Sequence, residues 1–91
     1  MYSVGLTPKD VQFKVAEQAK VLRKQAGYSQ ADLAKRSQVS LGSYKRFEAS
    51  GLIAFDALLR IAFIVGRLEL LSTVFEFRQQ PDFNKLFQKE V

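Results

Sequence analysis

The feature that most constrains this chain is the stretch of residues 29–51, SQADLAKRSQVSLGSYKRFEASG. Its apolar residues predict one short helix over about residues 30–36 and a second over about residues 41–48, joined by a tight turn. Ser40 is placed to cap the second helix, because a Ser hydroxyl can accept a hydrogen bond from a free N–H of the first turn. Ala34 is small where the two helices must approach closely. The apolar contacts between the predicted helices come from Leu33, Ala34, Val39, Tyr44 and Phe47.

One spaced pattern runs through this stretch: Ser29-Gln30, Leu33-Ala34, Val39-Ser40, Tyr44, Phe47-Glu48 and Gly51. In this pattern the chain resembles the Cro/repressor-type helix-turn-helix family of bacterial and phage regulators, also called the xenobiotic-response-element family. The resemblance covers about residues 22–71. It implies a helix-turn-helix whose second helix reads DNA in the major groove.

Four positions depart from the family pattern. Gln38 stands where the family usually has Gly in the turn, at a position that favours a positive φ, so we expect backbone strain there. Tyr44 and Phe47 replace the usual aliphatic residues, so the core must be shaped around aromatic rings. Ala54 stands where a Ser or Thr N-cap is common.

The segment before this stretch predicts a first helix. Thr7, Pro8 and Asp10 form a start signal, with Thr as the N-cap, Pro at the first helical position and Asp in the capping-box place. The helix is predicted to run to about residue 25 or 26, with Gly27 just beyond its end. Its predicted core stripe consists of Val11, Val15, Ala19, Leu22 and Ala26.

The segment after Gly51 predicts a helix over about residues 55–65, another over about residues 67–77, and a final short one over about residues 82–90. The core-facing stripe of the first is expected to be Phe55, Leu58, Leu59, Ala62 and Val65. That helix is apolar nearly all round, so it must be buried on more than one side, and we expect a second chain to cover it. The dimer or partner interface, within about residues 60–91, is predicted to contain Ile61, Ile64, Leu68, Phe75, Phe83 and Phe87.

Helical periodicity in every apolar segment predicts an all-α fold. We expect a compact bundle of four to five helices of the repressor-like type, with an extra C-terminal helical segment. The length of 91 residues fits a single helix-turn-helix domain spanning residues 1–91. The core of so short a chain is small, so association would help to stabilise it.

The residue types that are missing exclude several classes of function. The chain has no Cys and no His, which excludes disulfides, thiol nucleophiles, zinc fingers and His-based acid–base catalysis. Its glycines form no phosphate-cradling loop. We therefore expect no enzyme, no cofactor and no metal site. No apolar run reaches the length of a membrane span, and the first residues lack the layout of a secretory signal, so we expect a cytoplasmic protein. The family resemblance implies a bacterial or phage-encoded protein associated with DNA.

The positive charge is concentrated in one part of the chain. Residues 14–46 contain eight basic residues against Glu17 and Asp32, a balance of +6, while the whole chain carries +5. The basic excess therefore falls on the predicted helix-turn-helix, and a polyanion is the partner that this distribution favours.

The start of a recognition helix and the turn that follows point into the major groove. The predicted base-reading residues are Leu41, Gly42, Ser43, Lys45 and Arg46. Arg46 is the best candidate, because its guanidinium fork matches guanine O6 and N7. Predicted phosphate contacts are Ser29, Gln30, Lys24, Lys35, Arg36 and Ser40, with Arg23 as a further candidate. Glu48 is expected to be structural, either capping or pairing with Arg36.

The leading hypothesis is a dimeric, sequence-specific repressor of its own operon that binds a palindrome in double-stranded DNA. The alternative is an antitoxin that binds both operator DNA and a toxin protein. The segments Gly51-Leu52-Ile53, 58–62 and 66–69 are similar to regulators encoded beside HipA-type kinase toxins. A protein-interaction module without DNA affinity is a further class, which would show no salt-dependent DNA binding.

Overall fold

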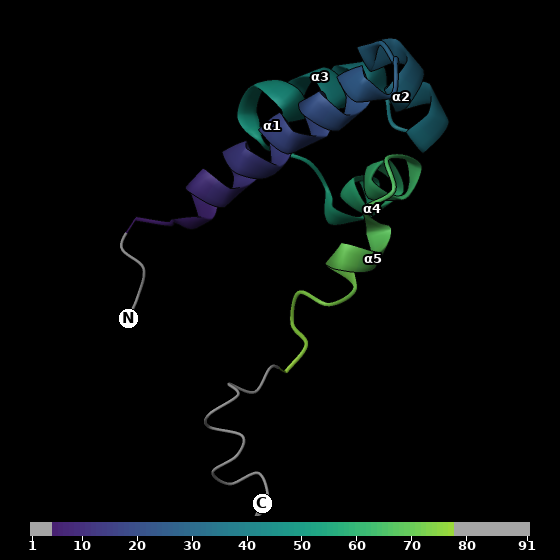
Figure 1. The fold of residues 1–91 in the computed structure, drawn as a ribbon. Coiled ribbons are helices and arrows are strands. Elements are labelled where there is room, and N and C mark those ends of the chain that lie inside the picture. The colour runs from purple at the N-terminus through teal and green to yellow at the C-terminus, as the bar shows by residue number, and fades with distance from the viewer. Residues whose placement is uncertain (1–4, 78–91) are drawn as a thin grey trace, which may run out of the picture.

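A computed structural model of the chain describes residues 5–77, and these residues fold into five α-helices with no strand among them (Figure 1). The helices are α1 (Pro8–Gln25), α2 (Gln30–Ser37), α3 (Leu41–Ser50), α4 (Phe55–Ile64) and α5 (Leu68–Leu71). The predicted all-α fold with four to five helices is therefore confirmed. No helix in this part of the chain is long and apolar enough to cross a membrane.

The predicted start of α1 is confirmed. The Thr7 hydroxyl accepts a hydrogen bond from the Asp10 N–H, and the Asp10 carboxylate accepts one from the Thr7 N–H, each 3.1 Å long. The helix ends at Gln25 with Ala26 as its C-cap, and Gly27 follows with a φ of 81°. The predicted core stripe is confirmed at Ala19, which is buried, and at Val15, which packs against the core. It is wrong at Val11 and Ala26, which are exposed, and the other buried positions are Ala16 and Arg23.

The turn between α2 and α3 has the predicted geometry. Gln38 adopts a left-handed conformation with φ 59° and ψ 44°, as expected from its place in the turn. The Arg60 guanidinium from α4 donates to the carbonyl of Ser37 at 2.9 Å and to that of Gln38 at 3.4 Å. A cation at the C-terminal end of a helix is favourable, so Arg60 stabilises the end of α2. The Ser40 hydroxyl caps α3 by accepting a 3.1 Å bond from the Ser43 N–H.

The core lies where α1, α2, α3 and α4 meet. α3 packs on α1 and on α2, and α2 packs on α4. Tyr44 and Phe47 are both buried, with their rings edge to face and their centroids 5.9 Å apart. Gly51 ends α3 with a φ of 81°, and a Cβ there would lie 2.8 Å from the Gln12 backbone. The core residues are Ala16, Ala19, Leu33, Ala34, Tyr44, Phe47 and Ile61.

The orientation of α4 agrees with the prediction only in part. Leu58 and Val65 pack against the core as expected. Ile61 is 1% exposed and lies in the core, so it is not available for an interface, whereas Phe55 is 64% exposed instead of facing inward. Ala62 is buried as expected, and Ile64 packs against the core while remaining partly exposed. The sequence could not fix this rotation, because a helix that is apolar nearly all round has no clear inward side.

The segment after α4 is less helical than predicted. α5 contains four residues, and a series of turns follows it as far as Glu76, in place of the helix predicted over about residues 67–77. α5 has no side-chain cap at its start, and Thr73 and Val74 are β-branched residues that disfavour helix. The Phe75 side chain is 97% exposed. Phe83, Phe87 and the helix predicted over about residues 82–90 lie outside the described residues.

Candidate nucleic-acid interface

The side of α3 that points away from the core presents the predicted base-reading residues. Tyr44 and Phe47 point inward, which leaves Leu41, Gly42, Lys45 and Arg46 exposed and Ser43 half-buried. One exposed neighbour was missed by the sequence analysis. Ala49 lies seven residues after Gly42, and two helical turns place both on the same side of the helix. We call this surface the outer face of α3: Leu41, Gly42, Ser43, Lys45, Arg46 and Ala49.

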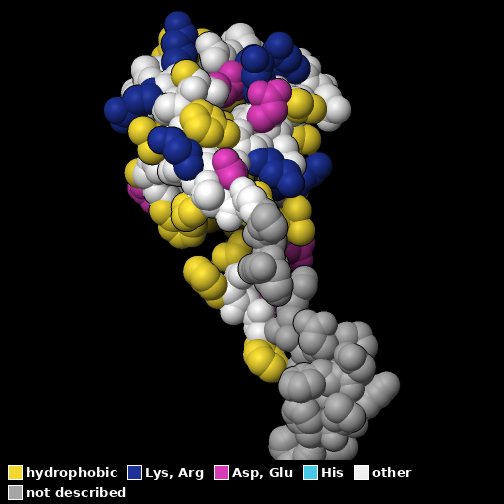
Figure 2. All heavy atoms as spheres, turned by 90° about the vertical axis from the view of Figure 1, so that its left-hand side faces the viewer, with side chains coloured by type: hydrophobic (Ala, Val, Ile, Leu, Met, Phe, Trp, Pro, Cys, Tyr) yellow, Lys and Arg dark blue, Asp and Glu magenta, His cyan; other side chains and the backbone are white. Residues whose placement is uncertain are grey.

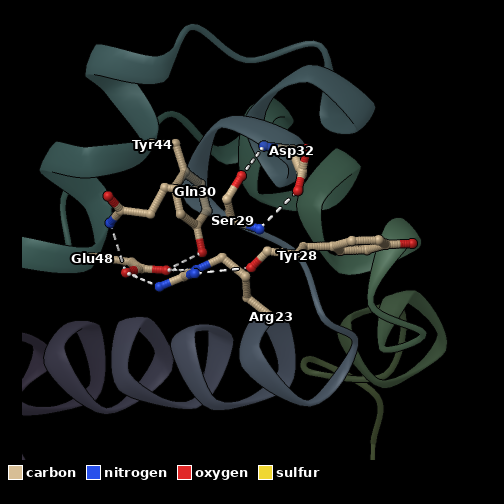
Figure 3. Close-up of polar contacts among 7 residues, drawn as sticks. All are labelled: Arg23, Tyr28, Ser29, Gln30, Asp32, Tyr44 and Glu48. Carbon is tan, nitrogen blue, oxygen red and sulfur yellow. Dashed lines mark hydrogen bonds and ion pairs between the residues drawn. The ribbon is translucent and has the colours of Figure 1, made fainter.

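A buried polar network fixes α3 relative to α1 and α2 (Figure 3). The Glu48 carboxylate accepts hydrogen bonds from Arg23 Nε at 2.7 Å and from Arg23 Nη2 at 3.1 Å. It also accepts bonds from the Gln30 amide at 2.9 Å and from the Tyr44 hydroxyl. Arg23 Nη1 donates to the Tyr28 carbonyl at 3.0 Å. We call these five residues the Arg23–Glu48 network, and it sets the angle at which the outer face of α3 is presented.

The charges of this network are stabilised by one another. The Arg23 and Glu48 side chains are only 9% and 6% exposed. Burial acts to raise the pKa of the Glu48 carboxyl, but the hydrogen bonds it accepts, first from Arg23, lower that pKa by more, so it lies below its ordinary value. The hydrogen bond to Glu48 raises the pKa of the Arg23 guanidinium. Burial, and then the neighbouring carboxylate, raise the pKa of the Tyr44 hydroxyl well above its ordinary range.

The network corrects two sequence-based predictions and qualifies a third. Glu48 is structural as predicted, but its partner is Arg23 and not Arg36. Arg23 is buried and engaged, so it cannot be the phosphate contact that was considered. The Gln30 amide nitrogen, predicted to meet a phosphate, donates to Glu48 inside the protein. A sequence separation of 25 residues between Arg23 and Glu48 left no local signal for their pairing.

The other candidate phosphate contacts lie at the surface. Lys24 and Lys35 are exposed, and Ser29 and Ser40 are exposed at the starts of α2 and α3, where their hydroxyls cap the helices. The Arg36 guanidinium stacks on the Tyr28 ring, 4.5 Å from its centroid. Figure 2 shows Lys and Arg side chains distributed over the helical bundle.

A shallow groove of about 270 Å³ lies between α3 and the start of α4. Ser40, Ser43 and Arg46 line its α3 side, and Ala54 lines its α4 side. Ala54 provides no side-chain cap for α4, so the backbone N–H groups of the first turn lack a side-chain acceptor. Asp56, in the first turn of α4, also lines this groove, and its carboxylate already lies near these N–H groups and opposes an anion there. Among residues 5–77, no group of three or more acidic side chains lies close enough to hold a metal ion.

Comparison with known proteins agrees with this geometry. Residues 20–62 match the family described as Helix-turn-helix, and they contain α2, the turn and α3 complete. The match supports a DNA-binding regulator of the helix-turn-helix type. Neither a curated protein nor a solved structure matches the chain.

Proposed function

We propose that this chain, which matches the Helix-turn-helix family over residues 20–62, is a sequence-specific transcriptional regulator that represses its own operon as a homodimer. The observation that carries the proposal is the outer face of α3. It is solvent-exposed, it includes two basic side chains, Lys45 and Arg46, and the buried Arg23–Glu48 network holds it in a fixed orientation. A rigid exposed helix is what base reading in the major groove requires.

Base recognition rests on the outer face of α3. Arg46 lies nearly two turns after the Ser40 cap, and its guanidinium can form two hydrogen bonds with one guanine. Leu41 can pack on a thymine methyl group, and Ser43 and Lys45 can hydrogen-bond to bases or phosphates. Gly42 has no side chain, and a Cβ there would meet nothing within 4 Å in the free protein. We infer that Gly42 lets the DNA approach the helix backbone closely.

Phosphate contacts set the register of the protein on the duplex. We assign them to Lys24, Lys35, Ser29 and Ser40. Gln30 and Arg36 already have partners within the protein, so their contribution to phosphate binding is smaller. If about four to six phosphates are neutralised per dimer, log K should fall with log salt at a slope of roughly −4 to −5.

A dimer would double the length of DNA that one helix-turn-helix covers, and its two recognition helices would meet half-sites about 34 Å apart on a palindrome. The exposed apolar side chains beyond the core support association. Phe55 and Phe63 of α4 are 64% and 67% exposed, and Leu68 and Phe75 follow them. Large exposed apolar patches are typical of interaction surfaces.

The same apolar surface supports a second candidate function. An antitoxin could bind a kinase-type toxin through Phe63 and the residues after α4, while α3 binds the operator. A kinase-like gene next to the coding sequence, and co-purification of its product with this chain, would favour the antitoxin. Dimerisation that fully buries Phe63 without a second protein would argue against it.

The proposal is tested by selecting bound sites from a pool of random duplexes with the purified protein. We expect enrichment of one palindromic sequence, and binding to it that weakens with salt at the slope given above. Enrichment of no sequence, or binding that salt does not change, would refute a sequence-specific DNA regulator.

A further inference from the structure

We propose that residues 70–77 bind in a groove of a second copy of the chain, so that two copies exchange these segments. We call residues 70–77 the arm. The proposal rests on the proposed dimeric regulator and deepens it, because it names the two surfaces that meet.

The receiving groove lies between the C-terminal end of α2 and the helices α4 and α5, and has a volume of about 470 Å³. Its walls are mainly apolar, and they include the Phe63 side chain, which is 67% exposed. Two basic residues, Arg36 and Arg60, are among those that line it. The residues that line it are Arg36, Ser37, Gln38, Leu59, Arg60, Phe63, Ile64 and Leu68.

The arm has the matching apolar side chains. Leu70 is 64% exposed, Val74 58%, Phe75 97% and Phe77 80%. Figure 1 shows the chain after α5 running away from the other helices, so the arm does not cover the groove of its own copy. Leu68 of α5 lines the groove, and the arm starts two residues later. A second copy that places its α5 beside this one therefore brings each arm within reach of the other copy's groove.

The charges of the two surfaces are complementary. The arm carries Glu76, and the groove carries Arg36, whose guanidinium stacks on Tyr28 and forms no ion pair with the residues that the structure describes. Arg60 is already paired with Asp56 at 3.2 Å. An apolar and acidic arm thus fits an apolar and basic groove that is present in the same chain. This complementarity favours a second copy over an unrelated protein as the occupant, and it points to Glu76 as the partner of Arg36.

Mixing two defective variants tests the exchange directly. The arm variant carries Phe75→Ser and Phe77→Ser, and the groove variant carries Phe63→Glu. All three side chains are exposed, so the monomer fold should be preserved, and circular dichroism checks this. By sedimentation velocity we expect each variant alone to dimerise at least tenfold more weakly than the wild type. An equimolar mixture should recover dimers, because the intact arm of one variant meets the intact groove of the other.

Four further variants provide the charge test and the control. Arg36→Glu and Glu76→Arg should each weaken dimerisation, and combining them in one chain should restore it. Val21→Ser, which changes a 45% exposed apolar side chain on α1, should leave dimerisation unchanged. A wild type that is monomeric at high concentration, or a mixture no more dimeric than its components, would overturn arm exchange.

The outcomes separate this inference from the proposed function. Sequence-selective DNA binding without recovery in the mixture would reject arm exchange and leave the regulator standing. Recovery in the mixture without sequence-selective DNA binding would keep the interface and reject the regulator.

Discussion

Replacing Gln38 by Gly is expected to stabilise the fold, although it shortens a side chain. Gln38 adopts φ 59° and ψ 44°, the left-handed conformation, at the end of α2. Its side chain is exposed and forms no hydrogen bond within residues 5–77, while its backbone N–H donates to the Lys35 carbonyl at 3.1 Å. Its carbonyl accepts a bond from Arg60. Glycine keeps both backbone interactions and removes the Cβ that makes the conformation unfavourable.

The expected magnitude follows from two opposing effects. The left-handed conformation is unfavourable by about 1–2 kcal/mol for a residue with a Cβ. Glycine has greater backbone freedom in the unfolded chain, which lowers stability by about 0.5–1 kcal/mol. The net gain in the free energy of unfolding for Gln38→Gly is therefore about 0.5–1 kcal/mol. Gln25→Gly is the matched control, because Gln25 is exposed at the end of α1 in a helical conformation, and it should lose about 0.5–1 kcal/mol.

Urea denaturation followed by circular dichroism measures both variants. The midpoint should rise for Gln38→Gly and fall for Gln25→Gly, with the slope of unfolding free energy against urea unchanged. In a domain of this size the melting temperature should move by a few degrees in the same directions. Equal destabilisation by both substitutions would refute the conclusion that Gln38 is held in a strained conformation.

Three further substitutions test other parts of the structure. Glu48→Gln leaves a buried Arg charge unpaired and should lower stability by about 3 kcal/mol at pH 7, whereas exposed Glu17→Gln should change it little. Folding lowers the pKa of Glu48, so the stability that its carboxylate contributes is present above the unfolded pKa near 4.5 and is lost as the pH falls through the folded pKa. The free energies of unfolding of the wild type and Glu48→Gln, measured against pH, should therefore converge as the pH falls through the folded pKa. Gly51→Ala should lower stability by about 2–4 kcal/mol, because the added Cβ overlaps the α1 backbone and also sits at a positive φ. Gly66→Ala, with a similar φ but open space around it, should lose only about 0.5–1 kcal/mol. Equal losses in thermal melts would contradict the close contact at Gly51. Gly42→Ala should raise stability by about 0.5 kcal/mol yet weaken binding to the selected DNA, and unchanged binding would show that the DNA does not approach the backbone there.

Local chemistry predicted the ends of the first three helices correctly. The capping box at Thr7 and Asp10, the cap at Ser40 and the positive φ of Gln38 were all expected from neighbouring residues. Each of these features depends on residues no more than four positions apart, so the local sequence is enough to predict it. The residues that face outward on α3 followed from helical spacing once Tyr44 was assigned to the core.

Features set by tertiary packing were not predictable in the same way. The pairing of Arg23 with Glu48 joins α1 to α3, and several basic residues were equally plausible partners from the sequence. Ile61 lies in the core together with the predicted stripe residues Leu58, Ala62 and Val65, because α4 packs on α2 with that side, and periodicity does not reveal which apolar side does so. α5 stopped at Leu71 although apolar spacing continued. Within residues 5–77, the apolar side chains that follow it, Val74, Phe75 and Phe77, stay exposed.

The most direct test of base reading by α3 compares Arg46→Ala and Lys35→Ala on the selected duplex and on a scrambled duplex, each at two salt concentrations. Arg46→Ala should weaken binding to the selected duplex by about 1–3 kcal/mol, relax the preference at one base position and leave scrambled DNA nearly unaffected. Lys35→Ala should weaken both duplexes about equally and make the salt slope shallower. Equal losses on both duplexes for Arg46→Ala would contradict the account and reduce Arg46 to a phosphate contact.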